Sequence, residues 1–269
     1  MADHILVKHY NELPFAKLSD TWRIHCKMGY NLNQHGFRSQ DFHQRKDINV
    51  ASIGCSNTLG WSLPIENRFS TIFCNKLETS CKESVQDWNF GLAGKSNDYI
   101  LRVVKILENT INPDIYLISF TGLGRREYWD NRGNCIDYVP NNYPEIVKKT
   151  NPSQFHNYKK IHLLQSEFDN IQNFIKNFHA IEGLLKNKNW YFTFSCGNEM
   201  AGTTDGSIED LIPQDKYVGY FHYHDWADDG LHPGPESNKV IAESFLDRYL
   251  NEPVGQTHIE RSDEIVRYF

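Results

Sequence analysis

The sequence predicts an α/β protein in which a parallel sheet of about five strands is covered by helices on both faces. Short apolar segments rich in β-branched and aromatic residues alternate with longer segments whose apolar residues have helical spacing. The predicted strands are residues 48–54, 84–91, 113–122, 190–197 and 216–223. The predicted helices are residues 68–80, 97–109, 154–186 (as one long helix or two short ones) and 237–250. This alternation favours a three-layer α/β/α domain with its functional residues at the carboxyl ends of the strands.

Local signals support the individual elements. The first strand, INVASIG, is a short, mostly apolar run with β-branched residues that ends in Gly54, as expected of a strand buried on both faces. The first helix carries its apolar residues on one face, at Phe69, Ile72, Phe73 and Leu77. The helix at 97–109 follows Ser96, a residue type that caps helix N-termini.

Three regions lie outside the alternating pattern. Residues 1–46 are polar and irregular, and we expect them to form an N-terminal extension packed on the core. Residues 47–252 form the core domain, interrupted around 125–153 by a segment rich in Asn, Tyr and Pro that predicts a flap. Residues 253–269 are expected to form a C-terminal tail.

Composition and charge argue against several classes of function. The formal net charge of -6 argues against a nucleic acid partner. No apolar run approaches the length needed to span a bilayer, and the first residues lack the pattern of a secretory signal. The six cysteines are scattered and form no CxxC pair, which favours free thiols. We therefore expect a cytoplasmic or otherwise soluble protein.

A serine directly follows the first predicted strand, in the segment GCSNTLGW. At this position Ser56 can point its hydroxyl into the crevice above the sheet, where backbone amides stabilise negative charge. A serine there can also simply cap the next helix, so Ser56 alone does not define a site.

A carboxylate and an imidazole follow the last predicted strand, in the segment HDWADDGLHPG. Asp229 lies three residues before His232, so it can accept a hydrogen bond from one ring nitrogen and leave the other free to take a proton. Gly94, after the second strand, can bring a backbone N–H close to a developing oxyanion. Each of these segments is equally compatible with an ordinary loop.

Taken together, the segments resemble the SGNH or GDSL-type serine hydrolases. The nucleophile block of that family, G-D-S-x-T-x-G, is similar to GCSNTLG at residues 54–60, and the lead-in NQHGFR and the continuation WSLPIENRF also resemble its pattern. The second block, N-x-x-x-x-G-x-S/T, and the last block, D-x-x-H-P, are matched by Asn89, Gly94, Ser96, Asp229, His232 and Pro233. The blocks occur in the family's order over roughly residues 33–250.

The resemblance implies a flavodoxin-like fold of the SGNH type and a serine ester hydrolase. In that mechanism Ser56 attacks the ester, His232 transfers the proton and Asp229 orients His232. The amides of Ser56 and Gly94 are the implied oxyanion hole. The resemblance implies no cofactor and no metal, and the expected partner is a small-molecule or glycan ester, preferably an O-acetylated carbohydrate.

The sequence departs from the family pattern at two places. Cys55 stands where the family usually has Asp before the nucleophile. No Asn follows the third predicted strand, where the family places an oxyanion donor. Thr121, Arg125 and Asn198 are the candidates for that role or for a substrate contact.

The sequence leaves two other functions open. His222, His224 and Asp225 lie in a stretch ending at His232 whose spacing is compatible with a metal-dependent hydrolase. The missing Asn is compatible with a non-catalytic binding or structural protein on the same fold, for example one associated with a virion. A chelator separates the first alternative from serine chemistry, and the presence of all three triad residues argues against the second.

Overall fold

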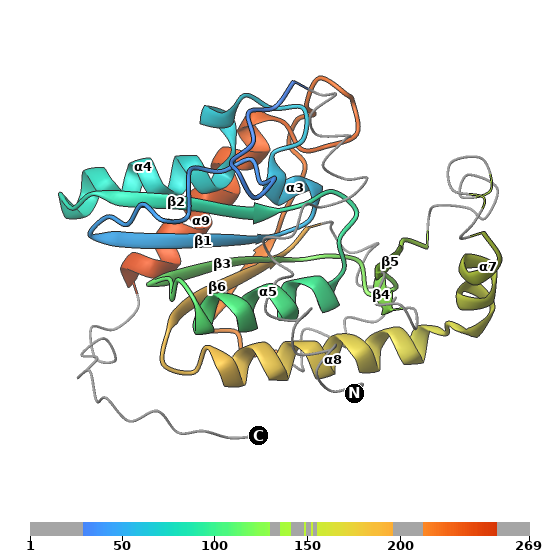
Figure 1. The fold of residues 1–269 in the computed structure, drawn as a ribbon. Coiled ribbons are helices and arrows are strands. Elements are labelled where there is room, and N and C mark those ends of the chain that lie inside the picture. Colours follow the sequence, from blue (N-terminus) through green and yellow to red (C-terminus); the bar gives the residue numbers. More distant parts are fainter. Residues whose placement is uncertain are drawn as a thin grey trace.

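Five strands form one parallel sheet that is covered by helices on both faces (Figure 1). The computed structural model describes residues 29–129, 135–140, 148, 152, 155–195 and 212–251. The strands are β1 (Ile48–Gly54), β2 (Val85–Gly91), β3 (Ile115–Phe120), β6 (Asn189–Phe194) and β7 (Tyr217–Tyr220). The fold class predicted from the sequence is confirmed.

The strand order decides where a site can form. The sheet has the order β2-β1-β3-β6-β7, and all neighbouring strands are parallel. Counted along the chain, this is the 2-1-3-4-5 order of flavodoxin-like sheets, in which the connections change direction between β1 and β3. Ligands of such sheets bind at this switch point, beyond the carboxyl ends of the strands. Ser56 follows the carboxyl end of β1 within two residues.

Helices cover both faces of the sheet (Figure 1). One face carries α4 (Phe69–Cys81) and α9 (Pro235–Asn251), and the other carries α5 (Asn97–Asn109) and α8 (Glu167–Leu184). Each pair of helices contributes its apolar residues to a separate core cluster. Because both faces are buried, the central strands are mostly apolar.

Most element bounds lie close to the prediction. α5 has the predicted bounds, and the Ser96 hydroxyl accepts a hydrogen bond from the Tyr99 amide at 3.3 Å. The long helical segment divides into α7 (Phe155–Leu164) and α8, because Ser166 caps a new helix there. β3 ends at Phe120 rather than at residue 122. Beyond it, the backbone of Thr121 pairs with the side chain of Asn97 instead of a neighbouring strand.

The segment expected to form a flap contains an antiparallel hairpin of β4 (Arg126–Trp129) and β5 (Cys135–Tyr138). An ion pair between Arg102 of α5 and Glu127 of β4 holds the hairpin, with Nη2 and Oε1 2.6 Å apart and both side chains buried. The described part of this segment is therefore anchored to the domain. The remaining positions around 141–154 lie mostly outside the described residues.

The described part of the N-terminal extension, residues 29–46, packs against the domain. Phe37 and Phe42 are buried in the core cluster on the α5 side. The Arg38 guanidinium donates hydrogen bonds to the carbonyl oxygens of Gly60 and Leu63, each at 2.6 Å. This segment therefore supports the turn that follows the first short helix, α3 (Ser56–Leu59).

Some expectations concern residues outside the described ranges, namely the first 28 residues and the predicted tail at 253–269. Within the described ranges, no helix is long and apolar enough to cross a bilayer. The four described cysteines, which are Cys55, Cys74, Cys81 and Cys135, are free thiols.

Candidate active site

Ser56 is the first residue of α3, at the point where β1 leaves the sheet. Its neighbours Cys55 and Asn57 are buried, whereas Ser56 itself is partly exposed. Gly54 allows this close turn: a Cβ there would lie 2.2 Å from Thr58 Oγ1 and 2.9 Å from the Ser119 carbonyl oxygen. The local packing thus leaves the hydroxyl of Ser56 reachable from solvent while its backbone is fixed.

Asp229 and His232 form a hydrogen-bonded pair in the loop between β7 and α9. Asp229 Oδ2 lies 2.6 Å from His232 Nδ1. The other carboxylate oxygen accepts hydrogen bonds from the amides of Leu231 and His232, at 3.0 and 3.1 Å. Gly230 has a φ of 65°, which allows the chain to turn back on the carboxylate.

The environment of Asp229 keeps its carboxylate ionised. Partial burial acts to raise the pKa of Asp229, but the hydrogen bonds from Leu231 and His232 outweigh it and place this pKa below its ordinary value. An ionised carboxylate accepts a hydrogen bond from the protonated Nδ1, so Nε2 of the neutral ring remains an acceptor. This is the tautomer that a general base requires.

Two contacts connect the nucleophile turn with the Asp229–His232 loop. The Trp61 ring stacks on the His232 ring, with centroids 5.7 Å apart and an interplanar angle of 29°. The Trp61 amide in turn donates to the Ser56 carbonyl oxygen at 3.1 Å. Asn57 donates to the Tyr223 hydroxyl, at the start of the same loop, at 2.8 Å. The structure therefore brings the three residues of the predicted triad to one edge of the sheet.

No hydrogen bond joins the Ser56 hydroxyl to His232 in this structure. Catalytic hydrogen bonds are often long or misaligned without substrate and shorten only in the complex. Trp61, Asn57 and Tyr223 were not predicted as site residues. Their place in the site depends on contacts between distant segments, which the sequence does not show. Only Trp61 could have been found, because it directly follows the segment GCSNTLG.

Asp225 fixes the base of the loop. Its carboxylate accepts hydrogen bonds from the amides of Glu236 and Ser237 and from the Ser237 hydroxyl, at 2.9, 2.8 and 2.7 Å. Asp225 therefore supplies hydrogen-bond acceptors for backbone amides in the first turn of α9. Burial acts to raise the pKa of Asp225, but the hydrogen bonds from Ser237 and Glu236 outweigh it and lower this pKa.

We expect Asp225→Asn to lower the free energy of unfolding by about 1–2 kcal/mol at neutral pH. A carboxylate whose folded-state pKa is depressed stabilises the fold above its unfolded-state pKa of about 3.9 and loses that contribution as pH falls further. The difference from the wild type should therefore shrink below about pH 4. Urea unfolding across pH measures it, with the exposed Asp247→Asn as control. If the difference in the free energy of unfolding between Asp225→Asn and the wild type persists unchanged in acid, the stabilising role of the ionised Asp225 carboxylate is contradicted.

The turn after β2 approaches the nucleophile helix from its other side. Gly94 is partly exposed and has a φ of 74°. Asn89 is buried, and its amide group donates to the Thr58 carbonyl oxygen at 2.7 Å and to the Ser70 hydroxyl at 3.2 Å. Gly91 lets β2 touch α3, since a Cβ there would lie 2.3 Å from the Leu59 amide nitrogen. Asn89 and Gly91 thus hold α3 against β2.

The segment after β3 contains Arg125, whose charge acts on Cys55, the neighbour of Ser56. Thr121 is buried and is fixed by its two backbone hydrogen bonds with the Asn97 side chain. Burial acts to raise the pKa of the Cys55 thiol, but the positive charge of Arg125 and a hydrogen bond with Ser195 outweigh it and lower this pKa. Nη1 of Arg125 is buried and makes no hydrogen bond within the described part of the chain.

The other predicted positions are placed as follows. Asn198 lies outside the described residues. His222 and His224 are exposed, with ring centroids 6.5 Å apart. Asp225 binds the start of α9, and among the described residues the stretch from 222 to 232 brings no three metal-ligand atoms together.

Aromatic and apolar side chains lie exposed beside the pair. Trp226 is 58 % exposed and packs edge-on against Tyr223, with centroids 5.2 Å apart. A β-bridge joins Trp226 to Pro233, directly after His232. Leu231 is also exposed. The described site thus combines an ordered acid–base pair, a reachable serine and an apolar border.

The fold and these residues define a flavodoxin-like α/β/α protein with a serine and an Asp–His pair at the carboxyl edge of its sheet. No protein-family model matches the sequence, and no curated protein sequence matches it. Solved structures do resemble the fold. One is the psychrotrophic esterase EstA from Pseudoalteromonas sp., with 11% identity, 77% of this chain and 100% of that chain covered and a TM-score of 0.47.

Two further structures have similar extents of overlap. The family 3 carbohydrate esterase of Clostridium thermocellum has 16% identity, with 74% of this chain and 94% of that chain covered and a TM-score of 0.44. A putative lipolytic protein of the G-D-S-L family from Desulfitobacterium hafniense has 11% identity, with 75% and 99% covered and a TM-score of 0.41.

Proposed function

We propose that the protein is a serine esterase that uses Ser56 as nucleophile, His232 as general acid and base, and Asp229 to orient His232. The single observation that carries the proposal is the 2.6 Å hydrogen bond between Asp229 and His232 Nδ1, on a ring that stacks against Trp61 of the nucleophile turn. Because Nδ1 is occupied by this hydrogen bond, Nε2 is the ring nitrogen proposed to act on Ser56.

In this mechanism His232 Nε2 takes the proton of the Ser56 hydroxyl as its oxygen attacks the ester carbonyl. The tetrahedral intermediate collapses to an acyl-enzyme and releases the alcohol, which receives the proton from His232. Water then attacks the acyl group while His232 takes a proton from it. His232 gives this proton to the Ser56 oxygen as the intermediate collapses and the acid leaves. Asp229 remains ionised throughout and stabilises the imidazolium.

The proposed oxyanion hole consists of the backbone amides of Ser56 and Gly94. Removal of one such donor costs about 10²–10³ in rate, so a third donor is expected to matter. Arg125 is the best supported replacement for the missing Asn among the three candidates. Its guanidinium has a buried nitrogen without a hydrogen bond and acts electrostatically on Cys55, the neighbour of Ser56.

For the substrate we propose a small acyl ester of a carbohydrate, with acetyl as the acyl group. The support is Trp226, an exposed indole whose edge is held by Tyr223 next to the catalytic loop. Exposed aromatic faces of this kind provide large, rigid contact area at low conformational-entropy cost, which suits the apolar face of a sugar ring.

We expect Trp226→Ala to raise KM for an acetylated xylo-oligosaccharide about three- to tenfold, since a stacking contact contributes about 1 kcal/mol. kcat on that substrate and hydrolysis of p-nitrophenyl acetate, which has no sugar ring, should change little. Steady-state kinetics on both substrates measure the difference, with Phe168→Ala, an exposed position on α8, as the matched control. Equal loss on both substrates argues against a sugar platform.

The proposed chemistry is tested by the release of p-nitrophenol from p-nitrophenyl acetate, with the wild type and Ser56→Ala each assayed with and without EDTA. Serine chemistry predicts activity that is retained in EDTA and lost in Ser56→Ala. Activity that is lost in EDTA and retained in Ser56→Ala overturns the proposal in favour of a metal-dependent hydrolase. A folded protein without activity on this ester or on acetylated glycans favours the non-catalytic alternative.

A further inference from the structure

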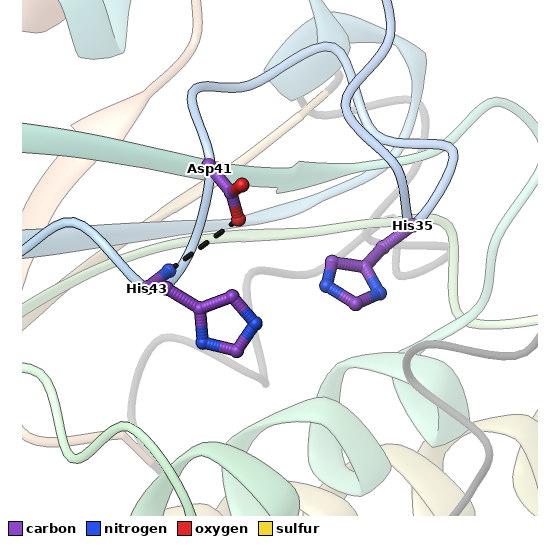
Figure 2. Close-up of side chains that lie close together, drawn as sticks. All are labelled: His35, Asp41 and His43. Atoms are coloured by element: carbon purple, nitrogen blue, oxygen red, sulfur yellow. Dashed lines mark hydrogen bonds between the residues drawn. The ribbon is translucent and has the colours of Figure 1, made fainter.

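We propose that His35, Asp41 and His43 bind a divalent transition-metal ion, with zinc as the best match. Their candidate ligand atoms, one from each side chain, all lie within 4.8 Å of one another. In Figure 2 the two imidazole rings and the carboxylate converge on one space beside the loop that carries them. The site is separate from the proposed triad and is not needed for its chemistry.

The donor set suits this class of metal. Two imidazole nitrogens and one carboxylate oxygen are ligands that zinc takes at about 2.0–2.2 Å, with a fourth position left for water. Neighbouring ligand atoms of a tetrahedral site with these bond lengths lie about 3.3 Å apart. The ligand atoms in the structure, which lie within 4.8 Å of one another, can reach this separation if exposed side chains such as His43 rotate. The backbone need not change.

The backbone of this loop is already ordered. Asn33 Oδ1 accepts hydrogen bonds from the amides of His35 and Phe37, at 3.0 and 3.1 Å. The His35 ring stacks on the buried Phe42, with centroids 5.6 Å apart and an interplanar angle of 11°. A metal therefore meets a largely formed site, and little of its binding free energy is lost in ordering the chain.

A second cluster in the same molecule shows what distinguishes this one. Glu127, Cys135 and Asp137 also place three ligand atoms within 4.8 Å. There, however, Arg102 binds Glu127 through two nitrogens, at 3.0 and 2.6 Å, and Lys95 binds Asp137 at 2.6 Å. Within the described ranges, no Lys or Arg forms an ion pair with Asp41, whose carboxylate accepts only from Gln34 and from the His43 amide.

A bound ion joins the two ends of the His35–His43 loop. The loop carries Arg38, which holds the turn after α3 through Gly60 and Leu63. Metal binding is therefore expected to stabilise the folded chain by an amount that grows with the logarithm of the ratio of free metal to its dissociation constant.

The test uses the full chain after EDTA treatment and removal of the chelator. Calorimetric titration with zinc chloride should show one ion bound per chain, and excess zinc should raise Tm by several degrees. His43→Gln and Asp41→Asn should each weaken binding at least tenfold and remove most of the Tm shift. Both positions are at least partly exposed, so these variants are expected to fold.

The matched controls are His179→Gln, an exposed histidine paired with Glu182, and His224→Gln in the β7–α9 loop. Both should bind zinc like the wild type. The proposal is overturned if the folded wild type binds no zinc, or if His43→Gln binds it with unchanged affinity. Loss of binding in His224→Gln alone also overturns it and moves the site to the β7–α9 loop.

Discussion

Ser56→Ala is expected to reduce kcat/KM for p-nitrophenyl acetate by about 10⁴–10⁶, because no other group in the proposed mechanism can form the acyl-enzyme. The residual rate should reflect only binding and the oxyanion donors. Ser56 is partly exposed and its hydroxyl makes no hydrogen bond with any described residue, so Tm should change little. Kinetics and thermal unfolding on the same preparation separate loss of chemistry from loss of fold.

A matched control for this variant is Ser80→Ala on α4. Ser80 is exposed, and its hydroxyl donates to the Lys76 carbonyl oxygen within the same helix. The esterase activity of Ser80→Ala should equal that of the wild type. Activity of Ser56→Ala within tenfold of the wild type would show that another residue is the nucleophile.

Asp229→Asn is expected to reduce kcat by about 10³–10⁴ with a smaller change in KM. An amide at this position can donate to Nδ1, which forces the proton of the neutral ring onto Nε2 and removes the general base. Rates measured as a function of pH test this. The difference in kcat between Asp229→Asn and the wild type should become smaller at high pH, because hydroxide replaces the base there. The neighbouring exposed Asp228→Asn is the control and should retain activity.

This second variant also distinguishes orientation from simple loop support. Asp229 Oδ1 accepts two backbone amides, and the Asn side chain can keep an oxygen in that position. If Asp229→Asn retains its fold and its full kcat, the Asp229–His232 hydrogen bond has no catalytic role. A loss of kcat at unchanged Tm supports the proposed role of Asp229 in orienting His232.

The fold was predictable because its signals are local. The buried strand Ile48–Gly54 is a mostly apolar run, and the helix Asn97–Asn109 combines a Ser96 cap with an apolar face. The alternation of these elements predicts a parallel sheet, and the handedness and order of crossovers follow from general rules. The hairpin from Arg126 to Tyr138 was not predicted, because its stability depends on the buried Arg102–Glu127 pair between distant segments.

The candidate site was predictable only in part for the same reason. Asp229 and His232 are three residues apart, so their contact follows from the loop itself. The stacking of Trp61 on His232 joins segments more than 170 positions apart in the sequence, and the pattern of residues does not encode it. Asp225 was read as one member of a metal-like stretch, whereas in the structure its carboxylate binds the start of α9.

The central claim is that Ser56 carries the acyl group during turnover, and peptide mapping by mass spectrometry tests it most directly. The wild type is mixed with excess p-nitrophenyl acetate, quenched in acid within the first turnovers, digested and mapped. The account predicts a mass increase of one acetyl group on the peptide that contains Ser56, absent from Ser56→Ala. An acetyl group on another residue, or active turnover with no covalent adduct at any quench time, would contradict it.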